Sequence, residues 1–583
     1  MRPHFLSAAL VVLVACGGGT TVSTPLPVSR AGGGTAVSAD AIVGGSPLVP
    51  PEWGLAGRAR AMTGARAMVV SGHPLASEVG IEILRQGGNA IDAAVAVGFA
   101  LEVVLPEAGN IGGGGFIVYR DTTGRVRALD YRETAPAGAS RDMYLDSAGH
   151  VTERSLTGHL ASGVPGSVAG MYEAWKKYGR RPWATLIAPA IRLAEGHMLD
   201  GVRSRDLEAD ADRLRLFPAS ARQFLVDGHA PPAGTMFRQP DLARTLAELG
   251  DNPDLLYRGR VGQAIAKRLE RDGFLTADDL AAHTGAWGEP ISTTYRGYTV
   301  WETPPPTQGL ATLLTLNLLE GFDVTAHPIH SVEHLHLLLE MTKLAYADRD
   351  RWVADPAASR VPIEALLDKD YAAPRRTLFD PDKAQRYEPG EVEGDTTGFV
   401  IADGRGNLLS VIQSIYKGFG AGVVAPGTGV VLQNRGAYFN TNPGHPNCFG
   451  PHKQPFHTLI ASIVTRDGRP VLGLANMGGD GQAMFHTQIL TNTFDFGMEI
   501  QEAIERPRFF MGRLEPSDAP DLVRLESRVP VPVREALVGR GHNILPVSDW
   551  FSQEGQAHAV AILKDGVLRG GADPRGDGAA VGY

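Results

Sequence analysis

Residues 394–403 read Gly394-Asp395-Thr396-Thr397-Gly398-Phe399-Val400-Ile401-Ala402-Asp403, a polar stretch that passes straight into an apolar, strand-like run. A threonine hydroxyl is a weak nucleophile and needs an adjacent base. If the chain were cut before Thr396, the new α-amine, with a reference pKa of about 7.7–8.0, would accept the hydroxyl proton near neutral pH. From these residues alone an ordinary strand start is the simpler interpretation, because Thr-Thr pairs are common.

The chain changes character at this stretch. After it, short apolar runs typical of strands lie at 399–401, 408–412, 430–432, 459–464 and 471–474. Before it, residues 165–380 alternate helical patterns with proline-rich turns. Helices that return over a large sheet favour an α/β fold class with layers in the order α/β/β/α.

The N-terminal part of this pattern is predicted to begin with a strand at 67–71 and a helix at 74–86. Residues 91–104 are almost all apolar, which predicts a helix buried on every side. A tight glycine turn at 112–115 then leads into a hairpin formed by 116–119 and 127–131.

Composition excludes several classes of protein. The 583 residues are 43% hydrophobic and 20% charged, which is typical of a globular protein with a large core. A net charge of −9 offers no basic surface for nucleic acid. The 71 glycines are not periodic, which excludes collagen, and their clusters mark close approach of backbone to backbone or ligand. Two cysteines cannot form a disulfide framework.

The first residues indicate export. An apolar run at 5–15 follows Arg2; it is too short to span a bilayer and has the length of a signal-peptide core. It ends Leu13-Val14-Ala15-Cys16, which resembles the lipobox of bacterial lipoproteins. We expect a signal peptide at 1–16, lipid on Cys16 that anchors the protein to the periplasmic or cell-surface side of a membrane, and a flexible tether at 17–55. An ordinary secretory signal with an incidental cysteine is the alternative.

Two further patterns could indicate a ligand site, one for a nucleotide and one for a metal ion. The 112–115 glycines lack both the Lys-Ser/Thr of a phosphate loop and the spacing of a dinucleotide fingerprint. His327, His330, His334 and His336 lie close in sequence, but their order is not His-Glu-x-x-His. The start of a helix with partly exposed histidines explains them better than a metal site does. We therefore expect no cofactor and no metal.

Motifs spread in order from Ala67 to Tyr583 identify the chain as a member of the gamma-glutamyltranspeptidase family of N-terminal-nucleophile hydrolases. They are His73-Pro74-Leu75-Ala76-Ser77, Gly87-Gly88-Asn89-Ala90-Ile91-Asp92-Ala93-Ala94, Gly109-Asn110-Ile111-Gly112-Gly113-Gly114-Gly115-Phe116, Tyr131-Arg132-Glu133-Thr134-Ala135-Pro136, Gly163-Val164-Pro165-Gly166-Ser167, Tyr346-Ala347-Asp348-Arg349, Asp395-Thr396-Thr397, Met477-Gly478-Gly479 and Gly571-Ala572-Asp573-Pro574-Arg575. The resemblance implies a four-layer α/β/β/α sandwich. It also implies a zymogen that cuts itself into a large subunit, 56–395, and a small catalytic subunit, 396–583, which remain together as a heterodimer.

The resemblance also assigns roles to residues. Thr396 becomes the nucleophile, and the family's assisting hydroxyl falls on Ser414. The backbone N–H groups that bind the oxyanion fall on Gly478 and Gly479. The arginine that grips the substrate's carboxylate falls on Arg132, and a guanidinium suits a bidentate carboxylate contact.

Some positions depart from the family pattern. Typical transpeptidases hold the substrate's α-amine with Asn, Gln and Asp, where this chain has Tyr416, Arg435 and Tyr438. The usual Ser-Ser pair is His457-Thr458. The stretch 432–439 resembles the acylase-like and oxamate-amidohydrolase-like branch. Arg435 either contacts a second anionic or carbonyl oxygen of the substrate, or is a structural arginine paired with an acid.

These expectations define the function. The resemblance implies a small-molecule amide substrate that bears a carboxylate, of the gamma-glutamyl type, cleaved through an acyl-enzyme on Thr396. An acylase-like enzyme for glutaryl or oxamyl amides without transpeptidation is the alternative. The short 439–455 segment suggests an open site that lacks the family's lid and therefore favours water as acceptor. A non-catalytic surface lipoprotein that keeps the fold is a third interpretation, against which Thr396, Ser414 and the glycine pair argue.

Overall fold

The computed structural model describes residues 60–270, 274–386, 395–514, 517–552 and 555–583. The predicted signal peptide, the tether, Cys16 and most of the polar loop before Thr396 lie outside these residues. Within them, no helix combines the length and the apolarity that crossing a membrane requires.

Two seven-stranded antiparallel sheets form the centre of the described chain. The first sheet has the order β19 (Ala579–Gly582), β2 (Met68–Ser71), β10 (Asp395–Ala402), β11 (Leu408–Tyr416), β3 (Gly114–Arg120), β4 (Val126–Asp130), β7 (Ala286–Gly288). The second has the order β1 (Met62–Gly64), β18 (Leu568–Ala572), β17 (Ala557–Ile562), β13 (Arg469–Asn476), β12 (Ala461–Arg466), β9 (Tyr298–Glu302), β8 (Ile291–Tyr295). Two smaller sheets join β14 (Phe509–Met511), β15 (Leu522–Glu526) and β16 (Asn543–Val547), and β5 (His197–Met198) with β6 (Met236–Phe237).

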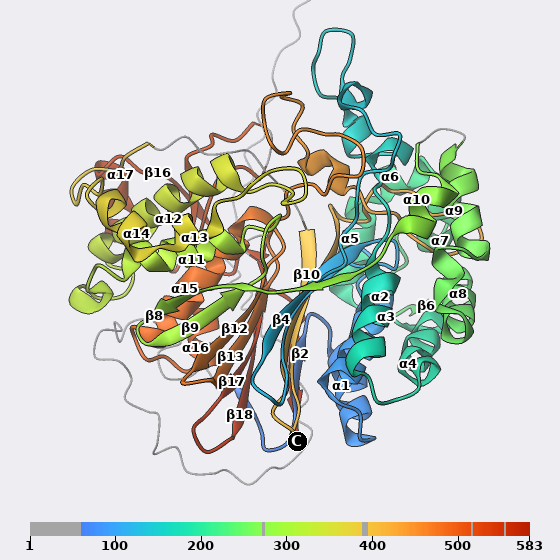
Figure 1. Cartoon of the computed structure of the whole chain (residues 1–583), viewed down its shortest axis with the longest axis horizontal. Coiled ribbons are helices and arrows are strands. Elements are labelled where there is room, and N and C mark those ends of the chain that lie inside the picture. Colours follow the sequence, from blue (N-terminus) through green and yellow to red (C-terminus); the bar gives the residue numbers. More distant parts are fainter. Residues whose placement is uncertain (1–59, 271–273, 387–394, 515–516, 553–554) are drawn as a thin grey trace, which may run out of the picture. The chain divides into compact units, whose positions relative to one another are not determined.

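Helices lie on the outer side of each large sheet (Figure 1). On the side of the first sheet are α1 (Pro74–Arg85), α2 (Ala90–Val104), α3 (Ser167–Tyr178), α4 (Trp183–Glu195), α5 (Gly201–Ala209), α6 (Ala211–Arg215), α7 (Pro218–Phe224), α8 (Pro240–Asp251), α9 (Arg260–Glu270) and α10 (Ala277–Ala282). On the side of the second sheet are α11 (Gly309–Leu319), α12 (Val332–Trp352), α13 (Ile363–Leu367), α14 (Lys369–Arg376), α15 (Gln482–Phe494), α16 (Ile500–Glu505) and α17 (Val531–Gly539).

Apolar side chains from both sheets fill the space between them. Val70 and Phe116 come from the first sheet and Ile463 and Val560 from the second, and all four belong to one buried cluster. Two further clusters join each sheet to its own helices. The predicted α/β/β/α sandwich is therefore confirmed.

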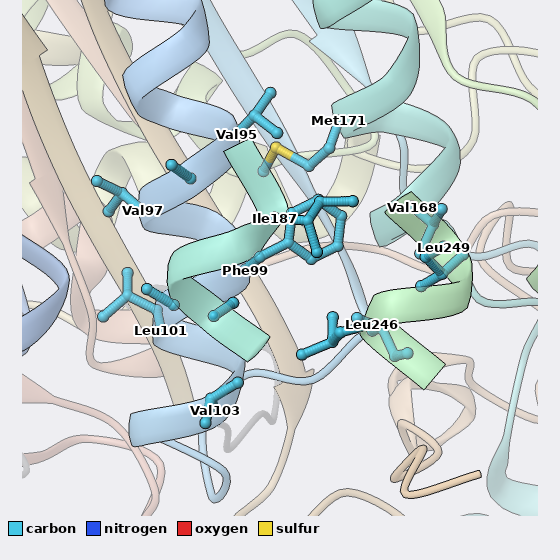
Figure 2. Close-up of a cluster of buried hydrophobic side chains, with 14 of the residues drawn as sticks. Val95, Val97, Phe99, Leu101, Val103, Val168, Met171, Ile187, Leu246 and Leu249 are labelled. Atoms are coloured by element: carbon cyan, nitrogen blue, oxygen red, sulfur yellow. The ribbon is translucent and has the colours of Figure 1, made fainter. Parts of the chain in front are cut away.

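Helix α2 is buried along its whole length, as its composition predicts. Asn89 and Asp92 form a reciprocal capping box at its N-terminus, which satisfies two backbone N–H groups. Figure 2 shows Phe99 of α2 beside Met171 of α3 and Ile187 of α4. This packing holds α2 against the first sheet, whose strand β10 carries Thr396.

Glu102 is an acid inside this apolar helix. Burial raises the pKa of its carboxyl from 4.5 to about 8, and a hydrogen bond with Ser167 offsets part of that shift. Since the unfolded chain ionises near 4.5 and the folded one near 8, the folded state binds one more proton between these values. Stability should therefore fall with rising pH in that window, by up to about 1.4 kcal/mol per pH unit.

Replacing Glu102 by glutamine removes this proton linkage and keeps the side-chain shape. We expect the melting temperature of Glu102→Gln relative to the wild type to rise steadily from pH 5 to pH 8, and then to level off. Thermal unfolding of both proteins across that range measures the difference. A difference that does not change with pH would show that Glu102 stays ionised in the folded protein.

One predicted strand is wrong. Residues 430–432 make only isolated bridges, Gly112 with Leu432 and Val424 with Val431. The run follows a turn that ends at Gly429, whose φ of 72° favours glycine, and its backbone bonds fold back onto residues 421–425. Gly112 lies so close to this segment that an added Cβ would stand 2.0 Å from the carbonyl oxygen of Val431. This confirms that the glycine cluster marks close backbone approach.

Candidate active site

Thr396 lies at an irregularity near the start of β10. Asp395 pairs with Tyr416 and Thr397 with Gln413, so Thr396 alone stands opposite two residues of β11, Ser414 and Ile415. A bulge of this kind re-aims side chains. Thr396 is completely buried. The tertiary structure therefore brings the two hydroxyl residues of the sequence prediction onto neighbouring strands.

Ser414 stands between the two predicted arginines. Arg132 Nη1 donates to the Ser414 carbonyl oxygen at 2.8 Å and also to the Gly114 carbonyl oxygen, on the strand that pairs with Ser414. Arg435 Nη2 donates to Ser414 Oγ at 3.2 Å, and the Tyr416 backbone N–H donates to the same oxygen at 2.7 Å. Hydrogen bonds to Ser414 thus hold both guanidinium groups beside the residue that stands opposite Thr396.

Arg435 is a fully buried cation. Its guanidinium carbon lies 4.6 Å from the ring centre of Tyr416 and 4.8 Å from that of Tyr438, and its Nη1 donates to Thr458 Oγ1 at 3.3 Å. Burial, and then the charge of Arg132, lowers the pKa of Arg435 to about 10. Within the described part of the chain no carboxylate forms an ion pair with it. The interpretation of Arg435 as a structural arginine paired with an acid is therefore not supported there.

Arg132, in contrast, has an acidic partner. Its Nη2 lies 2.5 Å from Glu133 Oε2, and both side chains are buried. His457 Nε2 lies 3.6 Å from the other oxygen of Glu133. Burial, together with the charges of Arg132 and Arg435, holds the pKa of His457 well below its usual range, so the ring is neutral at physiological pH. Glu133 was part of a quoted motif but received no role from the sequence.

The glycine pair follows β13 and forms the turn into α15. Gly478 has φ 116° and Gly479 has φ 53°, both in the region that favours glycine. A Cβ on Gly478 would lie 2.7 Å from the Phe485 ring. Among the described residues, no group accepts a hydrogen bond from either backbone N–H. These donors have the freedom that an oxyanion site requires.

A buried network fixes this turn. Of the side chains that form it, only Arg349 belongs to a motif quoted above, and that motif assigned it no role. Gln308 Nε2 donates to the carbonyl oxygens of Gly479 at 3.0 Å and Thr458 at 2.7 Å. Arg349 Nη1 donates to Gln308 Oε1 at 2.8 Å and to Asp480 Oδ1 at 2.9 Å. The network ties the predicted oxyanion turn to the predicted substrate-binding Thr458.

The open site expected from the short 439–455 segment is not seen in the uncut chain. Thr396 has 0% exposure. Phe449 of that segment stacks on Tyr144 with ring centres 4.5 Å apart, and Phe439 lies against Phe449. A short segment can still cover a site when its aromatic side chains pack inward.

One group of side chains among the described residues has the spacing of metal ligands, namely His336, Glu340 and His542. The rings of His336 and His542 are already joined by an Nδ1···Nε2 hydrogen bond of 2.7 Å. Glu340 pairs with Lys343 at 2.6 Å. These contacts join α12 to the residue that precedes β16. The predicted partial exposure of the histidines is wrong for His330, His334 and His336, which are buried.

Comparisons with known proteins agree with this geometry. The sequence pattern of the family described as gamma-glutamyltranspeptidase matches residues 76–583. The glutathione hydrolase-like YwrD proenzyme of Bacillus subtilis is 38% identical over 531 residues, 90% of this chain and 99% of the relative. The oxamate amidohydrolase proenzyme of Klebsiella pneumoniae is 36% identical over 88% of this chain and 98% of its own length. The crystal structure of cephalosporin acylase from Bacillus halodurans superposes with a TM-score of 0.84 at 35% identity, covering 92% and 99% of the two chains.

Proposed function

The chain belongs to the gamma-glutamyltranspeptidase family, and from this premise we propose that Thr396, freed by self-cleavage, hydrolyses gamma-glutamyl-like amides whose acyl part carries a carboxylate. Membership makes the protein an autoprocessing amidohydrolase with the N-terminal-nucleophile fold. The identity of the nucleophile and the chemistry of the acyl group are the proposed parts.

The proposed reaction has two steps. Thr396 Oγ attacks the amide carbon while its proton passes to the α-amine of the same residue, and the oxyanion binds the N–H groups of Gly478 and Gly479. The C–N bond then breaks, the leaving amine takes the proton, and an ester on Thr396 remains. Water adds to the ester carbon in the same way, the C–Oγ bond breaks, and Oγ takes back a proton as the acid leaves.

The proposed substrate class rests on one observation. The buried positive charge of Arg435 has no ion-pair partner among the described residues. A buried cation without an acidic partner is costly unless a ligand supplies the negative charge. The same guanidinium would repel a substrate ammonium, and the nearby carboxylate of Glu133 already pairs with Arg132. The site therefore suits an acyl group with a carboxylate, such as glutaryl or the oxalyl group of oxamate, and does not need an α-amine.

A matched pair of anilides tests the substrate class. The purified, processed protein should release aniline from the glutaryl compound at least as fast as from its γ-glutamyl counterpart, with oxanilate, the anilide of the carboxylate-bearing oxalyl group, as a third arm. Preference for the γ-glutamyl compound by orders of magnitude would mean that other residues bind the amine.

The two chains made by cleavage should remain together. The first sheet combines β2, β3, β4 and β7 from before Thr396 with β10, β11 and β19 from after it, and the second sheet is likewise mixed. Separating the chains would break strand pairing in both sheets and expose the core between them. This interleaving supports the proposed subunits, 56–395 and 396–583, as one stable heterodimer.

Anchoring through lipid is the proposed cellular arrangement, and it rests on Leu13-Val14-Ala15-Cys16. Cells that express the full sequence should place the protein in the membrane fraction with lipid on Cys16. Cys16→Ser should abolish lipid attachment, as mass spectrometry of the N-terminal peptide would show. Cleavage at another position without lipid would contradict the proposal.

A further inference from the structure

Gln482 touches the candidate nucleophile, although no motif of the sequence pointed to it. It is the first residue of α15, directly after the glycine turn, and it is fully buried. Its Nε2 lies 3.2 Å from Thr396 Oγ1, and its Oε1 lies 3.0 Å from the backbone nitrogen of Ile460.

The second contact fixes the orientation of the amide. A backbone N–H only donates, so the Gln482 atom that faces Ile460 must be the carbonyl oxygen. The atom that faces Thr396 is then the NH₂ group, which can only donate. Thr396 Oγ1 therefore accepts from Gln482, and its own hydroxyl proton is left for another acceptor.

We propose that Gln482 is a catalytic residue that stabilises negative charge on Thr396 Oγ; this rests on the proposed function of Thr396. Charge develops on Oγ when its proton passes to the α-amine, and again when the ester bond to Oγ breaks. Gln482 transfers no proton in either step. It keeps one N–H aimed at the oxygen throughout, as a preorganised donor that needs no rearrangement.

The same donor is in place before the chain is cut. In the continuous chain the Gln482–Thr396 bond is already formed, and self-cleavage needs the same oxygen to attack the carbonyl carbon of Asp395. Gln482 therefore acts on both the maturation and the turnover reactions. Only Asp480 and Gly481 separate the glycine pair from α15, so one short segment supplies donors to the oxyanion and to the nucleophile.

The substitution Gln482→Glu tests the hydrogen bond to Thr396 separately from the hydrogen bond to the Ile460 backbone. A carboxylate still accepts from the Ile460 N–H but presents an acceptor to Thr396, so the fold is kept and the donor is lost. We expect kcat/KM per cleaved chain to fall about 10²- to 10³-fold at the plateau of the variant's own pH profile, as for the loss of one such donor elsewhere. We also expect slower self-cleavage on a gel, and an acid limb moved to higher pH because a new anion favours the protonated α-amine.

Two companion variants complete the test. Gln482→Met removes both bonds and should lose activity at least as strongly as Gln482→Glu. Gln488→Glu is the matched control on the same helix: Gln488 bonds the Met484 and Phe509 carbonyls, so stability should fall while kcat/KM stays near that of the wild type. If Gln482→Glu keeps activity within about threefold of the wild type, whatever Gln482→Met does, the inference is wrong and Gln482 is only an anchor. A wild type that is neither cleaved nor active would instead contradict the proposed function.

Discussion

Replacing Thr396 by alanine is expected to leave the protein as one uncut chain and to abolish amide hydrolysis. The substitution removes the oxygen that attacks both the Asp395 carbonyl carbon and the substrate. Loss of a nucleophile in other acyl-transfer enzymes lowers kcat by about 10⁶-fold, so activity should fall below detection. A denaturing gel, N-terminal sequencing of the smaller band of the wild type, and an anilide assay measure the effect.

The neighbouring residue supplies the matched control. Thr397 lies on the same strand and is equally buried, and among the described residues its hydroxyl has no hydrogen-bond partner. Thr397→Val should therefore still be cut, with the new N-terminus at Thr396. Thr396→Ser keeps a hydroxyl and should retain measurable cleavage. A Thr396→Ala protein that is still cut, or an intact wild type with full activity, would exclude Thr396 as the nucleophile.

Replacing Arg132 by alanine is expected to remove most activity on amides that carry a carboxylate. Loss of one member of a desolvated charge pair commonly costs about 2–5 kcal/mol. Since each 1.4 kcal/mol is a factor of ten, kcat/KM for a glutaryl anilide should fall by about 30- to 4,000-fold. Activity on an uncharged butyryl anilide should fall far less, so the ratio between the two substrates isolates carboxylate recognition from any damage to the fold.

The partner of Arg132 requires a second variant. Arg132→Ala leaves the buried carboxylate of Glu133 without its ion pair at 2.5 Å. The double variant Arg132→Ala/Glu133→Gln removes both charges and should be the more stable protein, while it still discriminates poorly between glutaryl and butyryl anilides. If either variant keeps the wild-type preference for the glutaryl compound, Arg132 does not bind the substrate's carboxylate.

Elements with strong local patterns could be predicted from the amino-acid sequence. The all-apolar run at 91–104 predicted the buried helix, and the short apolar runs after Thr396 predicted β10, β11, β12 and β13 to within a few residues. Such elements follow from side-chain periodicity, which is a local property. The order of helical and strand-like segments also favoured the α/β/β/α layers. The family motifs supplied the candidate nucleophile, because the residues around Thr396 alone do not distinguish it from an ordinary strand start.

The assembly of the candidate site, in contrast, could not be predicted without the folded structure. The bulge that sets Thr396 opposite Ser414 depends on strand register, which no local pattern encodes. The contact of Gln482 with Thr396 joins positions 86 residues apart. Whether Arg435 was paired depended on which buried acids lie near it. The two that interact electrostatically with it, Glu133 and Asp480, form ion pairs with Arg132 and Arg349 instead. Charge balance in a core is a property of side chains that meet only after folding, so the sequence left this question open and the structure answered it.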